Sequence, residues 1–204
     1  MRDPAGPEEL TRVGALSIRR MRDSDDEYRQ LLAWRLEPHV RAVWDMDDDE
    51  DERSFEGIQQ HYGPRTDPND ATVAAFIELN DTPIGYIQFY PWSAYADEAR
   101  AMSIPTESES WGLDVFIGES DELDQGHGSR AVDLLCRYLF DQRGATSVAL
   151  LTEITNSRAQ RAYEKAGFHK VRLALDLDVR DGERIQSWLM VREREEQQPG
   201  PRTA

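Results

Sequence analysis

The sequence Leu123-Asp124-Gln125-Gly126-His127-Gly128-Ser129-Arg130 lies between an apolar run at residues 111–117 and a segment with helical periodicity at residues 131–142. This order predicts a strand, a glycine-bearing loop and a helix. The first turn of a helix has about four backbone N–H groups without intrahelical partners and carries about half a positive charge. Because glycine has no Cβ, a phosphate group can approach the main chain of this loop closely. The stretch is suited to bind an anion, although two glycines in a loop more commonly form only a turn.

Length and composition indicate one acidic domain. The 204 residues, 39% of them hydrophobic, are enough for one sizeable core. We expect a domain over residues 16–193 and flexible tails at residues 1–15 and 194–204. The 40 acidic and 24 basic residues give a net charge of −16, which disfavours nucleic acid and anionic membranes as partners and favours cations. Solubility alone also explains such a surface. The sequence has neither a signal-peptide pattern nor an apolar run long enough to span a membrane, so we expect a cytoplasmic location. We expect a monomer or a homodimer.

The order of the remaining segments predicts a mixed α+β domain. Strand patterns occur at residues 16–21, 72–79, 82–90, 111–117, 146–152, 168–178 and 185–192, and helical patterns at residues 28–34, 38–43, 53–62, 131–142 and 158–166. Asn80-Asp81 predicts a tight turn between two of these strands. The polar residues 91–110 predict a long loop, which we expect to form a wall of a substrate pocket. Cys136, the only cysteine, falls among leucines in a helical pattern and is expected to be a core side chain.

The most acidic run follows Trp44, over residues 45–52. Most charge runs are solvated loops, and acids at this position also suit the start of the helix at residues 53–62. A large amphipathic ring next to carboxylates is equally suited to receive a polyamine or a sugar. Both interpretations are open at this point.

Two segments resemble a known family. Residues 125–130, Gln-Gly-His-Gly-Ser-Arg, and residues 156–168, Asn-Ser-Arg-Ala-Gln-Arg-Ala-Tyr-Glu-Lys-Ala-Gly-Phe, look like the two acetyl-CoA motifs of the GNAT superfamily of N-acetyltransferases. Residues 61–62, 82–86 and 111–119 are similar to the aminoglycoside 6′-N-acetyltransferases of that superfamily. The resemblance covers about residues 16–192 and implies a single GNAT domain with a mixed central β-sheet flanked by helices. It also implies acetyl transfer from acetyl-CoA to the 6′-amine of an aminoglycoside, by direct attack in a ternary complex.

The resemblance implies two catalytic residues. An aliphatic amine has a pKa of about 10, so about one molecule in a thousand is neutral at neutral pH and a proton acceptor is needed. Asp114, a carboxylate in an otherwise apolar strand, is the implied acceptor; the alternative is a core carboxylate satisfied by backbone N–H groups. Tyr163 is the implied proton donor for the departing thiolate, and the alternative is an aromatic ring packed on Phe168.

The resemblance further implies residues that bind acetyl-CoA, and with them a backbone N–H that polarises the thioester carbonyl. These are Val115, Phe116, Ile117, Gln125, Gly126, His127, Gly128, Ser129, Arg130, Asn156 and Tyr163. Within this set, His127 is expected to point to solvent without a chemical role. Asn156 is equally suited to cap a helix.

The expected acceptor site is a negative cleft with indole stacking faces. It comprises Trp44, Asp45, Asp47, Asp48, Glu107, Glu109, Trp111 and Asp114, with no metal. Other acceptors remain open, such as a siderophore lysine, a polyamine or a protein N-terminus. A non-catalytic module that binds acetyl-CoA is the alternative from another class.

Overall fold

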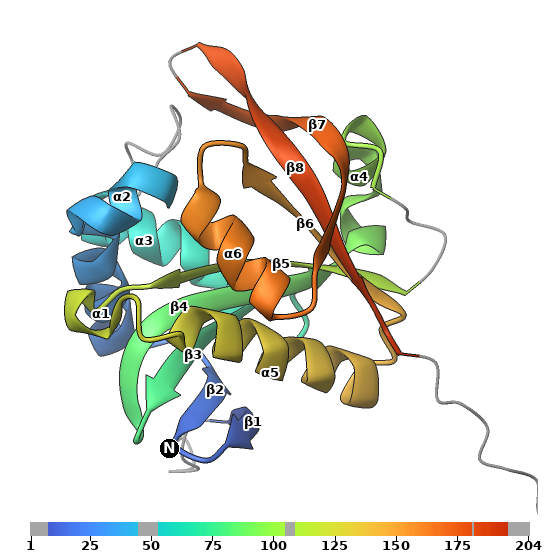
Figure 1. Cartoon of the computed structure of the whole chain (residues 1–204). Coiled ribbons are helices and arrows are strands. Elements are labelled where there is room, and N and C mark those ends of the chain that lie inside the picture. The colour runs from blue at the N-terminus through green and yellow to red at the C-terminus, as the bar shows by residue number, and fades with distance from the viewer. Residues whose placement is uncertain (1–7, 45–52, 105–108, 181, 196–204) are drawn as a thin grey trace, which may run out of the picture.

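One mixed sheet forms the centre of the molecule (Figure 1). The structure is a computed structural model that describes residues 8–44, 53–104, 109–180 and 182–195. The strands are β1 (Glu9–Val13), β2 (Leu16–Arg20), β3 (Val73–Leu79), β4 (Thr82–Pro91), β5 (Ser110–Ile117), β6 (Ser147–Glu153), β7 (His169–Arg180) and β8 (Glu183–Glu193). Their order in the sheet is β1-β2-β3-β4-β5-β6-β8-β7. The predicted strands are present, and the predicted α+β class is confirmed.

Helices cover both faces of this sheet (Figure 1). They are α1 (Asp25–Leu36), α2 (Pro38–Trp44), α3 (Phe55–Tyr62), α4 (Ala96–Ala101), α5 (His127–Gln142) and α6 (Ser157–Lys165), with short 3₁₀ helices η2 (Pro64–Thr66), η3 (Trp92–Tyr95) and η4 (Ser120–Glu122). Helices α5 and α6 pack on one face and α1 to α3 on the other. No helix within the described ranges has the length and apolar character needed to cross a membrane.

The sheet divides between β5 and β6. These two strands run parallel and pair only at Ser110 with Ser147 and at Trp111 with Val148. The other neighbouring strands pair antiparallel, over longer stretches. Beyond Trp111 the two strands separate, so the described sheet consists of one arm from β1 to β5 and a second arm of β6, β8 and β7. This division positions the candidate site.

Successive side chains along each strand point to opposite faces of the sheet, so a separate core lies on each face. Leu113 on β5 and Phe89 on β4 face the core under α5 and α6, where Cys136 is fully buried. Burial raises the pKa of the Cys136 thiol to about 12, as expected for a core side chain and not for a nucleophile. Phe116 and Tyr86, at the alternate strand positions, face the second core under α1 to α3.

Two local motifs agree with their predicted positions. Asn80 and Asp81 both have positive φ angles, 51° and 62°, as the tight turn between β3 and β4 requires. Gly167 follows the C-cap of helix α6 and has a φ of +87°; its amide donates to Glu164 O, and the amide of Phe168 donates to Tyr163 O. These two bonds are the pair that defines a Schellman motif.

Three predicted boundaries are wrong. Residues 9–13, predicted within a flexible tail, form β1, because their main chain pairs with β2. The loop predicted over residues 91–110 contains η3 and α4, because Trp92, Ala99 and Met102 bury their apolar surface against the sheet near β6 and β8. Helix α5 starts at His127 and not at residue 131, since its first turn is formed by the polar loop residues themselves.

Candidate active site

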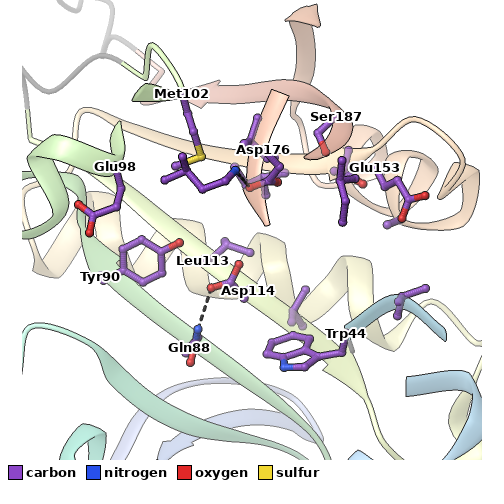
Figure 2. A pocket seen from close by; sticks show the side chains of 18 of the residues that line it. Trp44, Gln88, Tyr90, Glu98, Met102, Leu113, Asp114, Glu153, Asp176 and Ser187 are labelled. Atoms are coloured by element: carbon purple, nitrogen blue, oxygen red, sulfur yellow. Dashed lines mark hydrogen bonds between the residues drawn. The ribbon is translucent and has the colours of Figure 1, made fainter. Parts of the chain in front are cut away.

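A cleft of about 550 Å³ opens where β5 and β6 separate. Its walls include side chains from both arms of the sheet, from α2 to α4 and from α6. Figure 2 shows Asp114 at its centre, with Gln88 and Tyr90 beside it and with Glu153 and Asp176 across from it. The cleft is therefore polar and acidic at its centre.

Asp114 is a half-buried carboxylate held by side chains of β4. It faces Gln88 directly in the strand register, and Gln88 Nε2 donates to Asp114 Oδ2 at 2.8 Å. The Tyr90 hydroxyl also interacts with Asp114; burial, the carboxylates of Asp114 and Asp176 and a hydrogen bond with Asp114 raise the pKa of Tyr90 well above its usual value. A Cβ at Gly112 would lie 2.4 Å from Tyr90 Cε2, so glycine at position 112 lets the Tyr90 ring lie against β5.

Tyr163 lines the same cleft from α6 and is 8% exposed. Its ring packs on Phe168 at a centroid distance of 5.8 Å, across the Schellman motif that ends the helix. Burial, and next the Asp114 carboxylate, raise the pKa of the phenol above its usual value. Tyr163 therefore carries its proton at neutral pH, and its packing and its place in the cleft coexist.

The glycine loop and the start of α5 have the features of an anion site. Gly126 caps the helix with φ +79°, and Arg130 N donates the first intrahelical bond to Gly126 O. The N–H groups of residues 127–129 precede that bond and are available to an anion. Side chains brace the loop: Gln125 Nε2 donates to Asp121 O at 2.6 Å, and Ser129 Oγ donates to Gly126 O at 3.0 Å. Arg130 is exposed beside them.

The prediction that His127 points to solvent is wrong. The side chain is buried, with 7% exposure, and its Nε2 lies 3.0 Å from Glu122 Oε2. Because the first residue of α5 turns inward, its ring connects the helix start to η4. The sequence offered no signal for this contact, since Glu122 is one of several acids before the loop.

The free edge of β5 and Asn156 are the remaining residues predicted to bind acetyl-CoA. Beyond Trp111 the main chain of β5 has no β6 partner in the described sheet, and Val115 lines the cleft there. Phe116 and Ile117 pack their side chains into the two cores, and His39 Nε2 contacts Ile117 O at 3.0 Å. Asn156 Oδ1 accepts from Ala159 N at 3.0 Å as the cap of α6, and the residue also lines the cleft.

Two of the residues predicted to bind the acetyl acceptor, Trp44 and Asp114, line the cleft. Trp44 lines the cleft and its indole meets the Phe116 ring edge-on at 4.8 Å. Asp45, Asp47, Asp48 and Glu107 lie outside the described residues.

Two other predicted acceptor residues lie away from the cleft. Trp111 is 5% exposed and packs with Phe89 in the core under α5, at the point where β5 still pairs with β6 through Val148. Glu109 is exposed and precedes β5, away from the cleft lining. Neither Trp111 nor Glu109 forms part of the cleft.

Three carboxylates that the sequence did not indicate line the cleft instead. Glu98 is on α4, Glu153 ends β6, and Asp176 is on β7 (Figure 2). The described lining residues thus include four carboxylates, these three and Asp114, and a single guanidinium group, that of Arg65. They lie on elements far apart in sequence, and α4 itself was predicted as loop, so no local pattern marks them as a group.

A divided sheet with a glycine-capped helix start, and with a free strand edge beside a half-buried carboxylate, is the arrangement expected of a coenzyme A-dependent acyltransferase. The family model described as "Acetyltransferase (GNAT) domain" matches residues 23–174, and the chain belongs to this family. It is an acetyltransferase, and acetyl-CoA is its acetyl donor.

Curated relatives and solved structures agree with the family. The aminoglycoside N(6′)-acetyltransferases type 1 of Klebsiella pneumoniae and Serratia marcescens are each 26% identical over 156 residues, 76% of this chain and 75% of the relative. The crystal structure of AAC(6′)-Ib with coenzyme A and kanamycin matches with a TM-score of 0.66, at 23% identity, over 88% of this chain and 95% of that one. A spermidine N-acetyltransferase SpeG chimera from Vibrio cholerae and hSSAT matches with a TM-score of 0.67 at 15% identity, over 88% and 96%.

Proposed function

We propose that this chain acetylates the 6′-amino group of aminoglycosides, by direct attack of the amine in a ternary complex with acetyl-CoA. The observation that carries the proposal is the cleft lining: Glu98, Glu153 and Asp176 surround Asp114 beside the free edge of β5. An aminoglycoside carries several ammonium groups, and carboxylates spread over a cleft raise its local concentration and orient it. The aminoglycoside acetyltransferases at 26% identity support this acceptor.

The donor side of the proposal follows from the main chain. The N–H groups at the start of α5 are suited to a pyrophosphate, and the free edge of β5 near Val115 is suited to pair with an extended amide-bearing arm. The residues present therefore fit acetyl-CoA. When bound, it supplies the acetyl group as a thioester.

Asp114 and Tyr163 then divide the proton transfers. Asp114, held by Gln88 and Tyr90, accepts the proton of the attacking amine. Tyr163 keeps its proton at neutral pH and donates it to the departing thiolate. Trp44 offers an indole face at the cleft wall for the sugar rings.

A panel of amines tests the acceptor, with thiol release as the readout. We expect turnover of kanamycin and tobramycin, with much lower kcat/KM for spermidine, lysine hydroxamates and peptides with a free N-terminus. Mass spectrometry and NMR of the product would place the acetyl group on the 6′-nitrogen. Turnover of another amine with none of the aminoglycosides would overturn the acceptor, and tight acetyl-CoA binding without turnover of any amine would indicate a non-catalytic module.

Replacing the proton acceptor tests the mechanism. We expect Asp114→Asn to lower kcat by about a hundredfold or more, the low end for the loss of a general base. The affinity for acetyl-CoA, measured by calorimetry, should stay nearly unchanged, because the start of α5 is not touched. A kcat close to that of the unmodified chain would remove Asp114 from the mechanism.

A further inference from the structure

The amide of Gln88 has a fixed orientation. Its Oε1 accepts from Arg65 Nη1 at 2.5 Å and from the Tyr86 hydroxyl at 2.9 Å. Its Nε2 donates to Asp114 Oδ2 at 2.8 Å. An arginine side chain has donors and no acceptor, so the oxygen end of the amide must face Arg65. The NH₂ end is then the one that meets the carboxylate.

Arg65 is itself held in place and charged. It belongs to η2, lines the cleft, stands over the Tyr62 ring at 5.0 Å and contacts His61. Burial works against its charge, but the phenols of Tyr86 and Tyr62 and the carboxylate of Asp114 act the other way, and the net effect raises the pKa of Arg65 above its usual value. A chain of contacts therefore runs from α3 and η2 through Gln88 to Asp114.

We propose that Arg65 is a positioning residue for acetyl transfer: by holding the oxygen of the Gln88 amide, it directs the amide NH₂ to Asp114 and keeps this carboxylate aimed into the cleft as a proton acceptor. The inference rests on the proposed role of Asp114. Without a donor at position 65, only the Tyr86 hydroxyl still holds the amide oxygen, so the amide rotates more readily and can place its oxygen against the carboxylate. Two hydrogen-bond acceptors, the amide oxygen of Gln88 and the carboxylate of Asp114, would then face each other. Their repulsion favours rotation of the Asp114 side chain or protonation of its carboxylate.

Other groups also act on Asp114, and the test must hold them constant. The titratable and charged side chains that line the cleft around it or act on it from the surrounding elements are His61 and Tyr62 on α3, Arg65 on η2, Tyr86 and Tyr90 on β4, Tyr95 on η3, Glu98 on α4, Glu153 on β6, Tyr163 on α6 and Asp176 on β7. All of them are retained in the variants below except Arg65. Because His61 contacts Arg65, the change in the pH profile is read by comparing Arg65→Met with Gln88→Leu, in which His61 keeps this contact.

The variants are Arg65→Met, Arg65→Lys, Gln88→Leu and the double variant Arg65→Met/Gln88→Leu, with Arg137→Met as the matched control. Arg137 is an exposed arginine on α5 that pairs with Asp133. In Arg65→Met we expect kcat to fall about ten- to a hundredfold, the effect of one lost hydrogen bond to a charged group. The acidic limb of the pH profile of kcat/KM should move to higher pH, and the KM for acetyl-CoA should stay unchanged. Arg65→Lys should recover most of kcat, because lysine is also a pure donor.

The double variant decides between a positioning role and a merely structural one. If Arg65 acts through Gln88, the double variant should be no slower than Gln88→Leu alone. Full additivity of the two losses, or an unshifted acidic limb in Arg65→Met, would overturn the inference. Should Arg65→Met fail to fold, as judged by its thermal transition, an unshifted acidic limb in Gln88→Leu would overturn it equally. Every assay uses whichever amine the unmodified chain turns over best, so an absence of aminoglycoside turnover counts against the proposed function alone.

Discussion

Trp111 and Asp114 lie three positions apart on β5, and their side chains reach opposite faces of the sheet. Trp111 packs with Phe89 in the core under α5, while Asp114 meets Gln88 in the cleft. Gly112, on the same face as Asp114, leaves room for the Tyr90 ring. One short sequence thus serves two purposes: its large indole stabilises the core, and its carboxylate and glycine shape the site.

The cleft acids give a prediction at the scale of single residues. We expect Asp176→Asn and Glu98→Gln each to raise the KM for a cationic acceptor several-fold, because each removes a carboxylate from the lining. The KM for acetyl-CoA should be unaffected. Steady-state kinetics with the best aminoglycoside provide the measurement.

Glu109→Gln is the matched control for these two variants. Glu109 is exposed and lies outside the described lining, so its substitution should leave both KM values unchanged. An increase in KM for Glu109→Gln as large as that for Asp176→Asn would contradict the assignment of the cleft acids.

At the scale of elements, the ends of α5 and α6 set the geometry of the site. The start of α5 presents N–H groups from a loop braced by its own side chains. The end of α6 places Tyr163 by a Schellman motif, and Gln160 Nε2 donates to Glu153 O and Ile154 O, which connects α6 to the end of β6. In the proposed function, the start of α5 binds acetyl-CoA, and the end of α6 places Tyr163 in the cleft.

Two glycines that follow these helices allow a controlled test of stability. Gly144 and Gly167 both have positive φ angles, 70° and 87°. A Cβ at Gly144 meets nothing within 4 Å, whereas a Cβ at Gly167 lies 3.3 Å from Arg192 Nε. Arg192 Nη1 donates to Asp133 and to Ala166 O, which connects β8 with α5 and α6.

We expect Gly144→Ala to lower the free energy of unfolding by about 1 kcal/mol, the cost of a left-handed L-residue. Gly167→Ala should lower it by more, about 2 kcal/mol, because Arg192 must also shift. Urea denaturation of both variants checks the order. Equal losses would show that the contact with Arg192 has no energetic weight.

At the scale of the whole molecule, the division of the sheet creates the cleft. The net charge of −16 produces a negative field that attracts cationic acceptors to it. Screening by salt shortens the reach of this field, from about 10 Å at 0.1 M to about 3 Å at 1 M. We expect kcat/KM for an acceptor with several ammonium groups to fall about tenfold or more over that range. The same measurement with a monoamine is the control, and an equal fall for both acceptors would argue against attraction by the cleft.

The sequence by itself determined the local motifs of this protein. Residues 125–130 and 156–168 are each contiguous, and the structures that they form are local: a helix start exposes its own backbone N–H groups, and a cap and a Schellman motif are completed within a few residues. Among the described elements, alternating and helical patterns likewise predicted the strands other than β1 and the α-helices other than α4. Asp114 was recognisable because a carboxylate is unusual in an apolar strand.

Only the tertiary structure decided which side chains line the cleft. Which face Trp111 takes, and that Glu98, Glu153 and Asp176 meet around Asp114, depends on how strands distant in sequence pair and where β5 leaves β6. The contact between Arg65 and Gln88 likewise joins η2 to the centre of β4. The physical reason is that backbone preferences act over a few residues, whereas a cleft is formed by side chains that the packing of the whole sheet brings together.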